Sequence, residues 1–417
     1  MTSPLSTPLT LPGGAVLPNR IAKAAMSEGM ADPANRSTPR LQALYGTWAE
    51  SGAGLLLSGN IQVDRWHLER PGNVVLEDES GLAELRAMTA AATSGGAHFW
   101  AQLGHTGRQV ESAINPEPLA PSCVEIDVMR GAGFSFAPPR AMTEAEIGHA
   151  IGQFAVSARL AKAAGFTGIQ LHAAHGYLFS QFLSPLANRR GDRWGGPLEN
   201  RARLLLETIA AVRAAVGAGF PIGVKLNASD FQKGGFTNAD CLQLTDWLND
   251  TTLDLLELSG GSLEQPKQVG VSVKDEGEDF RPPSTIAREA YFVSFAGAVR
   301  AVATMPVMVT GGFRGAAGMV GALEAGELDL VGIGRPFIAD PRTGVRLLSG
   351  EIARAATPED NIGLFHLLGW NNTQLERLGD GLAPDLALGG EEATKLFRAR
   401  EAQVLARLLD QRGRRAA

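Results

Sequence analysis

Short apolar runs alternate with amphipathic stretches along most of this chain, and this alternation constrains the fold more than any other feature. Buried parallel strands form continuous apolar runs, and a strand followed by a helix is the repeating unit of α/β folds. Eight strand-like runs, seven of them followed by a helical stretch, predict a closed (β/α)8 TIM barrel rather than an open doubly wound sheet. The predicted strands are 21–25, 54–58, 98–103, 168–171, 222–226, 255–258, 307–310 and 330–333, and the predicted helices are 39–51, 80–95, 143–164, 200–216, 239–250, 289–303 and 314–325.

The segments outside this alternation are expected to complete the barrel. Residues 9–17 suggest a small N-terminal hairpin that crosses the barrel floor. We expect the barrel to span residues 1–345, and residues 346–417 to form a C-terminal helical extension packed on or near it, with a charged tail that is solvated or frayed. Residues 265–283 are charged and irregular, so they either cover the mouth of the active site or form a solvated surface loop.

Composition limits the class of protein. Hydrophobic residues make up 44% of the chain and charged residues 20%, so a core can form, and a net charge of −6 gives no general attraction to nucleic acid or anionic membranes. The N-terminus lacks a signal-peptide pattern, and no apolar run is long enough to span a bilayer. Cys123 and Cys241 lie far apart, which excludes a Cys-ligated iron–sulfur cluster and favours a reducing cytoplasm. We expect a cytoplasmic enzyme with a small-molecule substrate and no nucleic-acid or membrane partner; its oligomeric state is left open.

One short segment concentrates side chains that can do chemistry. His172, His175 and Tyr177 directly follow the apolar run 168–171, in a chain with seven His and three Tyr. Two imidazoles can hold a carbonyl or phenolate oxygen by two hydrogen bonds, and a neighbouring phenol can supply a proton. The segment predicts a carbonyl-polarising site in which these residues bind the substrate and catalyse its reaction. The alternatives are a metal-binding His pair and a structural cluster.

Two further loops suggest a phosphate site. In a TIM barrel, phosphate usually binds at the loops after the seventh and eighth strands. Here those loops contain Gly311, Gly312, Phe313 and Arg314 in one case, and Gly334 and Arg335 in the other. Glycines let backbone N–H groups approach phosphate oxygens, and a following helix N-terminus adds a favourable dipole. Each glycine turn alone is weak evidence, but together they predict a phosphorylated cofactor or substrate.

The chain resembles the Old Yellow Enzyme family of FMN-dependent ene-reductases, the NADH:flavin oxidoreductases built on an FMN-binding barrel. The resemblance runs from about Leu17 to about Pro341. Its most specific part is His-Ala-Ala-His-Gly-Tyr-Leu at 172–178, with Phe-Leu-Ser-Pro at 182–185, Asn-Arg-Arg at 188–190, Asp-Arg-Trp-Gly-Gly-Pro-Leu-Glu-Asn-Arg at 192–201, and supporting matches at 101–108 and 334–336.

The resemblance implies a function and assigns residues to it. FMN would be the cofactor and NADH or NADPH a transient reductant, in a ping-pong reduction of the C=C bond of an α,β-unsaturated carbonyl compound. His172 and His175 would hold the carbonyl oxygen, and Tyr177 would give a proton to the α-carbon. The residues implied to contact FMN are Ala25, Met26, Ser27, Gly59, Gln102 and Lys225 at the ring, and Gly311, Gly312, Phe313, Gly334 and Arg335 at the phosphate.

Three positions depart from the family pattern. Many members have Pro where this chain has Ala25, and Thr or Cys where it has Ser27, which keeps a hydroxyl group to tune the flavin. Lys225 stands where many members place Arg beneath the flavin ring, so its charge can neutralise a reduced flavin but holds it less rigidly. A lysine within the apolar run 222–226 would otherwise be buried without a partner.

Other classes of protein stay open at this point. A flavin-free barrel aldolase or isomerase would use Lys225 as a Schiff-base or acid–base residue. A non-catalytic flavin- or metabolite-binding protein would keep the phosphate loops without turnover. A metal hydrolase is the weakest alternative, because no third ligand with suitable spacing follows the His pair, and we predict no metal site.

Overall fold

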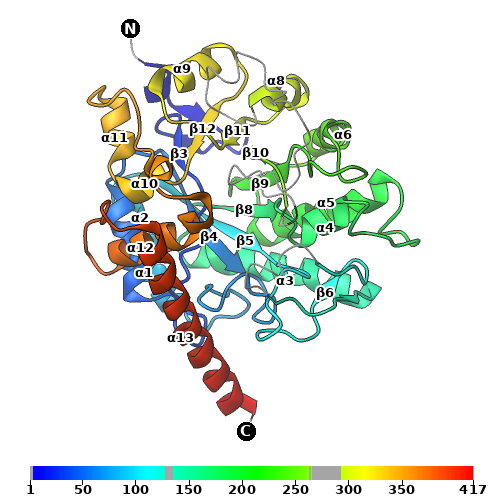
Figure 1. The fold of residues 1–417 in the computed structure, drawn as a ribbon. Coiled ribbons are helices and arrows are strands. Elements are labelled where there is room, and N and C mark those ends of the chain that lie inside the picture. The colour runs from blue at the N-terminus through cyan, green and yellow to red at the C-terminus, as the bar shows by residue number, and fades with distance from the viewer. Residues whose placement is uncertain (1–2, 127–134, 263, 265–292, 417) are drawn as a thin grey trace.

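Eight parallel strands close into a barrel at the centre of the computed structural model, which describes residues 3–126, 135–262, 264 and 293–416 (Figure 1). Each predicted strand overlaps an observed one, so the TIM-barrel prediction is confirmed. The strands, in their order around the barrel, are β10 (Leu255–Ser259), β11 (Val307–Thr310), β12 (Leu330–Ile333), β3 (Ile21–Lys23), β4 (Leu55–Gln62), β5 (His98–Gly104), β8 (Gly168–Ala173) and β9 (Ile222–Asn227).

Helices surround the barrel, and two of them have a threonine as the N-cap residue. Thr143 and Thr237 each form a reciprocal capping box with the acidic residue three positions on, which satisfies backbone N–H groups at the helix start. The helices of the barrel are α1 (Pro39–Ala49), α2 (Leu82–Thr93), α3 (Glu144–Ala163), α4 (Leu178–Leu183), α5 (Leu198–Val216), α6 (Asn238–Asn249), α8 (Val293–Val302) and α9 (Ala316–Glu324). The short α4 was not predicted.

Two predicted elements lie partly or wholly outside the residues that the structure describes. Residues 289–292 of the predicted helix 289–303, and the whole predicted loop 265–283, lie outside the described residues. Two short strands, β6 (Leu119–Ala120) and β7 (Arg140–Ala141), pair beside the barrel. Within the ranges that the structure describes, no helix is both long and apolar enough to cross a membrane.

An N-terminal hairpin closes the floor of the barrel, as predicted. Its strands β1 (Leu9–Thr10) and β2 (Val16–Leu17) pair antiparallel. Leu9 and Leu17 pack against apolar side chains at the amino ends of the barrel strands, among them Leu55 and Leu255. Full burial of a leucine contributes roughly 1.5–3 kcal/mol to the free energy of unfolding. The hairpin therefore seals one end, and the carboxyl ends of the strands are left for a site.

The C-terminal extension packs on the barrel through α12 (Leu367–Gly379) and through part of α13 (Gly390–Ala416). Helix α10 (Pro336–Ala339) lies before the predicted boundary, and α11 (Thr343–Leu348) crosses it. The extension beyond them also contains the turns η4 (Pro358–Asp360) and η5 (Leu364–His366). Helix α12 packs on α1, and α13 packs on α12 (Figure 1). Leu408 of α13 is buried against Leu68 and Val110 of the loops after β4 and β5. The domain boundary at residue 345 stays a prediction.

The predicted solvated tail is wrong for one of its arginines. Arg412 donates hydrogen bonds to the carbonyl oxygens of Ile114, at 2.8 Å, and Arg65, and its guanidinium lies 4.5 Å from the ring centre of Trp66. A long arginine side chain can cover apolar surface while its charged end binds carbonyl groups. The tail therefore extends α13 over the loop after β4.

Candidate active site at the carboxyl end of the barrel

His172, His175 and Tyr177 lie together at the carboxyl end of β8. The ring centres of His172 and His175 are 5.0 Å apart, and those of His172 and Tyr177 are 4.8 Å apart, both edge to face. His175 has a positive φ of 62°, an uncommon backbone conformation for a residue other than glycine. Asn227 of β9 accepts a hydrogen bond from its backbone N–H at 3.2 Å and so fixes the turn. The predicted grouping of the three side chains is what the structure shows.

Both imidazoles are neutral at ordinary pH. Burial, and next the positive charge of Lys225, lower the pKa of His172 and of His175 well below 6.5. Nδ1 of His172 accepts a hydrogen bond from the backbone N–H of Ala174 at 3.3 Å, so its proton must lie on Nε2. Nε2 of His175 lies 2.8 Å from the hydroxyl of Ser259. The pair can therefore donate hydrogen bonds to an oxygen without carrying charge.

The carboxylate of Glu69 influences the ionisation of Tyr177. Glu69, in the loop after β4, accepts a hydrogen bond from the hydroxyl of Ser27. Burial, followed by the charge of Glu69, raises the pKa of Tyr177 well above 10.0. The phenol is therefore protonated and available as an acid. Glu69 was not predicted, because it lies in an irregular loop whose sequence carries no catalytic pattern.

A row of polar side chains crosses the interior of the barrel on four adjacent strands. Gln102 donates to Gln170 at 2.7 Å, and Gln170 donates to Glu257, also at 2.7 Å. The other carboxylate oxygen of Glu257 lies 2.9 Å from the ammonium group of Lys225. Gln102 and Lys225 were predicted as site residues, but Gln170 and Glu257 were not. Each of these two is a polar residue within an otherwise apolar strand, β8 or β10, and this feature of the sequence could have identified them.

Lys225 therefore has a protein partner that the sequence did not predict. Glu257 is fully buried, with 0% of its surface exposed. Without Lys225 its charge would therefore be buried without compensation. Lys225 also pairs in register with His172 across β8 and β9, which places its charge beside the His pair. The amine of Lys225 is engaged by Glu257 rather than free to attack a carbonyl compound, which argues against the aldolase alternative.

The residues predicted at the other side of the flavin ring also adjoin one another. A Cβ at Gly59 would collide with the carboxylate of Glu28 and the carbonyl oxygen of Met26, so only glycine allows this approach. The N–H of Gly59 donates to Glu28 at 2.9 Å. A Cβ at Gly334 would lie 3.7 Å from Sδ of Met26, and Ala25 packs against the barrel interior. Met26 therefore lies between the ends of β4 and β12.

The two predicted phosphate loops meet at a shared carboxylate. Gly311 and Gly312 have positive φ values of 128° and 90°, a conformation that glycine adopts without the steric cost other residues incur. The side chain of Phe313 is buried, and its carbonyl oxygen accepts from Arg314 at 2.7 Å. Glu359 of η4 contacts both Arg314 and, at 4.0 Å, Arg335. Both arginines lie at these loops, and the acidic residue between them was not predicted.

A different cluster, Asp64, His67 and His105, brings ligand atoms within 4.8 Å of one another. Nε2 of His67 accepts the N–H of Leu119 at 3.1 Å, and Nδ1 of His105 accepts the N–H of Gly107 at 3.0 Å. The remaining nitrogen of each ring must then carry its proton toward Asp64, and a protonated nitrogen does not ligate a metal. The cluster is therefore a carboxylate, Asp64, that faces the N–H groups of two imidazoles.

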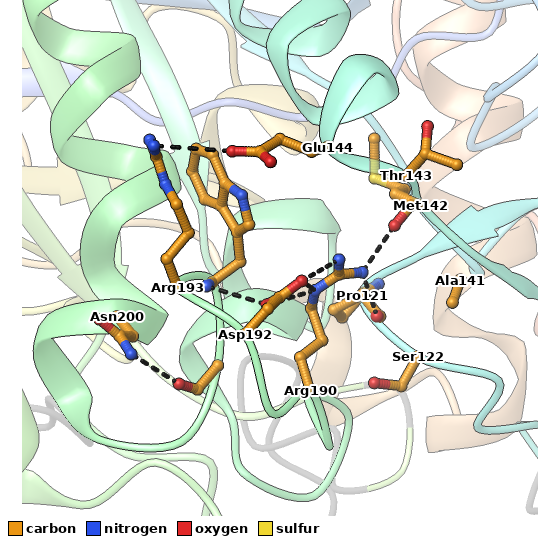
Figure 2. Close-up of polar contacts among 12 residues, drawn as sticks. Pro121, Ser122, Ala141, Met142, Thr143, Glu144, Arg190, Asp192, Arg193 and Asn200 are labelled. Atoms are coloured by element: carbon orange, nitrogen blue, oxygen red, sulfur yellow. Dashed lines mark hydrogen bonds and ion pairs between the residues drawn. The ribbon is translucent and has the colours of Figure 1, made fainter.

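Polar contacts join the segment 188–201 to neighbouring parts of the chain (Figure 2). Arg190 donates to the carbonyl oxygens of Pro121, at 3.0 Å, and Met142, at 2.6 Å, and forms an ion pair with Asp192. Arg193 lies 3.6 Å from Glu144 at the start of α3. These contacts tie the loop after α4 to β6, β7 and α3. The contacts thereby hold in place the loop that follows α4, which in turn follows the His172–Tyr177 turn.

Comparison with known sequences gives matches over most of the chain. The sequence profile of the NADH:flavin oxidoreductase / NADH oxidase family matches residues 4–352. The NADH-dependent flavin oxidoreductase nadA of Aspergillus parasiticus is 36% identical over 354 residues, which cover 82% of this chain and 77% of that protein. The NADH-dependent flavin oxidoreductase iliE of a Neonectria species is 37% identical over 351 residues, which cover 80% of this chain but 45% of that protein. The chain thus spans less than half the length of the Neonectria relative.

Solved structures give the same result. Morphinone reductase superposes with a TM-score of 0.71 and 25% identity, covering 88% of this chain and 93% of that one. An old yellow enzyme homologue from Zymomonas mobilis superposes with a TM-score of 0.70 and 24% identity, covering 85% of this chain and 95% of that one, and at this identity supports the fold alone.

Proposed function

Because the chain belongs to the NADH:flavin oxidoreductase / NADH oxidase family, we propose that it uses NADH or NADPH to reduce the C=C bond of α,β-unsaturated carbonyl compounds in a ping-pong cycle. The Old Yellow Enzyme resemblance is confirmed at the level of the family, and FMN is the cofactor of that family. The observation that carries the proposal is the convergence of two neutral imidazoles and a protonated phenol at the mouth of the barrel.

The residues present fit FMN. At the loops after β11 and β12, Gly311 and Gly312 present backbone without side chains, and Arg335 supplies a cation for a phosphate group. At the barrel mouth, the positive charge of Lys225 beside His172 suits an anionic reduced ring. Bound FMN would carry two electrons from the nicotinamide coenzyme to the substrate.

The protein groups orient the substrate and supply its proton. Nε2–H of His172 donates to the carbonyl oxygen of the substrate. When the hydroxyl of Ser259 donates to Nε2 of His175, the proton of His175 lies on Nδ1 and provides the second donor. These donors stabilise the negative charge that develops on the oxygen during reduction. Tyr177 then gives its hydroxyl proton to the α-carbon.

Removing the arginine at the phosphate loop should weaken cofactor binding. Arg335→Ala is expected to raise the Kd for FMN by roughly 10- to 100-fold, because a charge-assisted hydrogen bond is lost. The measurement is titration of the apoprotein with FMN, followed by flavin fluorescence. Arg342→Ala removes an exposed charge a few residues further on and should leave the Kd unchanged. A protein that is colourless and takes up no FMN would contradict the proposed cofactor.

The pH dependence of the reaction should be flat over a wide interval. The pKa of each imidazole is lowered from 6.5 and that of Tyr177 is raised from 10.0, so none of the three changes protonation between these values. We expect enone re-oxidation of the reduced enzyme, measured anaerobically, to be constant from about pH 6.5 to about pH 10. A step near neutral pH would contradict the neutral state of the two imidazoles.

A further inference from the structure

The row of polar side chains inside the barrel is a chain of hydrogen bonds that runs in one direction. Nε2 of Gln102 on β5 donates to Oε1 of Gln170 on β8, and Nε2 of Gln170 donates to Oε2 of Glu257 on β10, each at 2.7 Å. Oε1 of Glu257 lies 2.9 Å from Nζ of Lys225 on β9. The exposed fractions of the four side chains lie between 0% and 4%, so water does not compete for these contacts. These four residues are called the polar row below.

The two charged members fix the direction of every hydrogen bond in the polar row. An ammonium group can only donate, and a carboxylate can only accept. Gln170 must therefore turn its –NH2 group toward Glu257, which leaves its oxygen to face Gln102. Gln102 must in turn direct its –NH2 group to Gln170, so its own oxygen is left at the end of the row. A carboxylate on β10 thus decides which end of an amide on β5 is free.

The oxygen of Gln102 is a hydrogen-bond acceptor that the protein leaves open. Among the residues that the structure describes, no group donates to Oε1 of Gln102. Below it, two positions back on the same face of β5, lies Trp100, which packs in an apolar cluster with Leu255. Above the row, His172 lies two positions beyond Gln170 on the same face of β8. Because a buried amide oxygen is seldom left unpaired, we expect its donor to come from the mouth of the barrel.

We propose that Glu257 and Gln170 are positioning residues that hold the oxygen of Gln102 toward FMN, where it accepts a hydrogen bond from N3–H of the flavin ring. This inference rests on the proposed function, because it presupposes FMN at the mouth of the barrel. The pyrimidine edge of FMN carries two carbonyl groups and a single N–H donor, at N3. An acceptor fixed at Gln102 therefore matches N3–H and no other group of that edge. Glu257 and Gln170 touch neither cofactor nor substrate and act through Gln102.

The substitution Glu257→Gln should reverse the polar row. Lys225 can only donate, so the introduced amide turns its oxygen to Lys225 and its –NH2 group to Gln170. Gln170 then turns its own –NH2 group to Gln102, whose –NH2 group becomes the free end. This group and N3–H of FMN are both donors, so the hydrogen bond between protein and ring is lost. The size of the side chain at position 257 is unchanged.

The measurement is a ratio of two dissociation constants, that of 3-methyl-FMN, which lacks the N3–H donor, divided by that of FMN. Each is obtained by titrating the apoprotein and following flavin fluorescence. The ratio in the parent should exceed that in Gln102→Met by roughly 10- to 100-fold, because Gln102→Met removes the acceptor and leaves only the steric cost of the methyl group. Glu257→Gln should lower the ratio to that of Gln102→Met or below. A loss of stability alone changes both constants together and leaves the ratio unchanged.

A second variant, Gln170→Met, interrupts the polar row without removing a charge, since the ion pair of Glu257 remains. It should also lower the ratio, because the amide of Gln102 is then free to turn, and it decides the question alone if Glu257→Gln does not fold. The matched control is Gln374→Met in α12. Gln374 is also 0% exposed and exchanges two hydrogen bonds with the backbone of Asp385, at 2.8 Å and 2.7 Å. The control should keep the ratio of the parent.

The outcomes separate this inference from the proposed function. If Gln102→Met lowers the ratio but Gln170→Met and Glu257→Gln keep it at the parent value, the roles of Gln170 and Glu257 are wrong and the proposed function stands. An equal ratio in the parent and in Gln102→Met would overturn the contact between Gln102 and N3–H, and this inference with it. A protein that binds neither flavin would contradict the proposed cofactor, and both proposals would fail.

Discussion

Replacing Tyr177 by phenylalanine should slow re-oxidation of the reduced enzyme by cyclohexenone by roughly 10²–10⁴-fold, the usual contribution of a general acid. The substitution removes only the hydroxyl group and leaves the ring that packs against His172 at 4.8 Å. Flavin binding and reduction by the coenzyme should be nearly unchanged. Anaerobic rapid mixing separates the two half-reactions. Quinones and nitro compounds should re-oxidise the variant well, because they need no protonation of carbon.

His172→Ala should give a different pattern. The carbonyl oxygen loses one of its two hydrogen-bond donors, so the enone should bind more weakly and should also be reduced more slowly. A Tyr177→Phe variant that turns over the enone at the normal rate would show that solvent delivers the proton. In that case the hydroxyl of Tyr177 would have a structural role only.

Replacing Lys225 by methionine should lower the free energy of unfolding by about 3–5 kcal/mol, because the fully buried Glu257 loses the partner of its charge. Chemical denaturation of the FMN-free and FMN-bound proteins measures the loss. The double variant Lys225→Met/Glu257→Gln removes both charges and should recover most of the stability. If the single variant is as stable as the parent, the ion pair does not hold Glu257 in the charged state.

The same double variant isolates the effect of Lys225 on the flavin. Lys225→Met alone removes the cation and leaves the carboxylate, so it should lower the flavin reduction potential and slow reduction by the coenzyme. The double variant removes both charges and should lower the potential less. Equal potentials in all three proteins would contradict a role for Lys225 beneath the ring.

The barrel could be predicted from the sequence because its information is local. Each strand is a short apolar run, and the closing hairpin around Gly13 and Gly14 has its own turn signal. His172, His175 and Tyr177 were also accessible, since they lie on one turn after one strand. Short-range patterns therefore gave the architecture and one wall of the candidate site.

The partners of these residues could not be predicted in the same way. Glu69 reaches Ser27 from an irregular loop, and Glu359 reaches Arg335 from the C-terminal extension. Such contacts join segments far apart in the chain, and no spacing in the sequence encodes them. The pairing of Lys225 was missed for another reason: Glu257 was visible as a charge in an apolar strand, but its neighbour across the sheet depends on register.

The ion pair between Glu401 of α13 and Arg70 limits how this protein can be recombined with its relatives. Glu401 binds Arg70 across 331 positions of sequence, and Arg70 in turn donates to the carbonyl oxygen of Ser27 at 3.2 Å. A chimera that exchanges the last helix without its counterpart in the loop after β4 would leave a buried guanidinium without its carboxylate. Crossovers in a shuffled library should therefore keep residues 70 and 401 from the same parent, although 331 positions of sequence separate them.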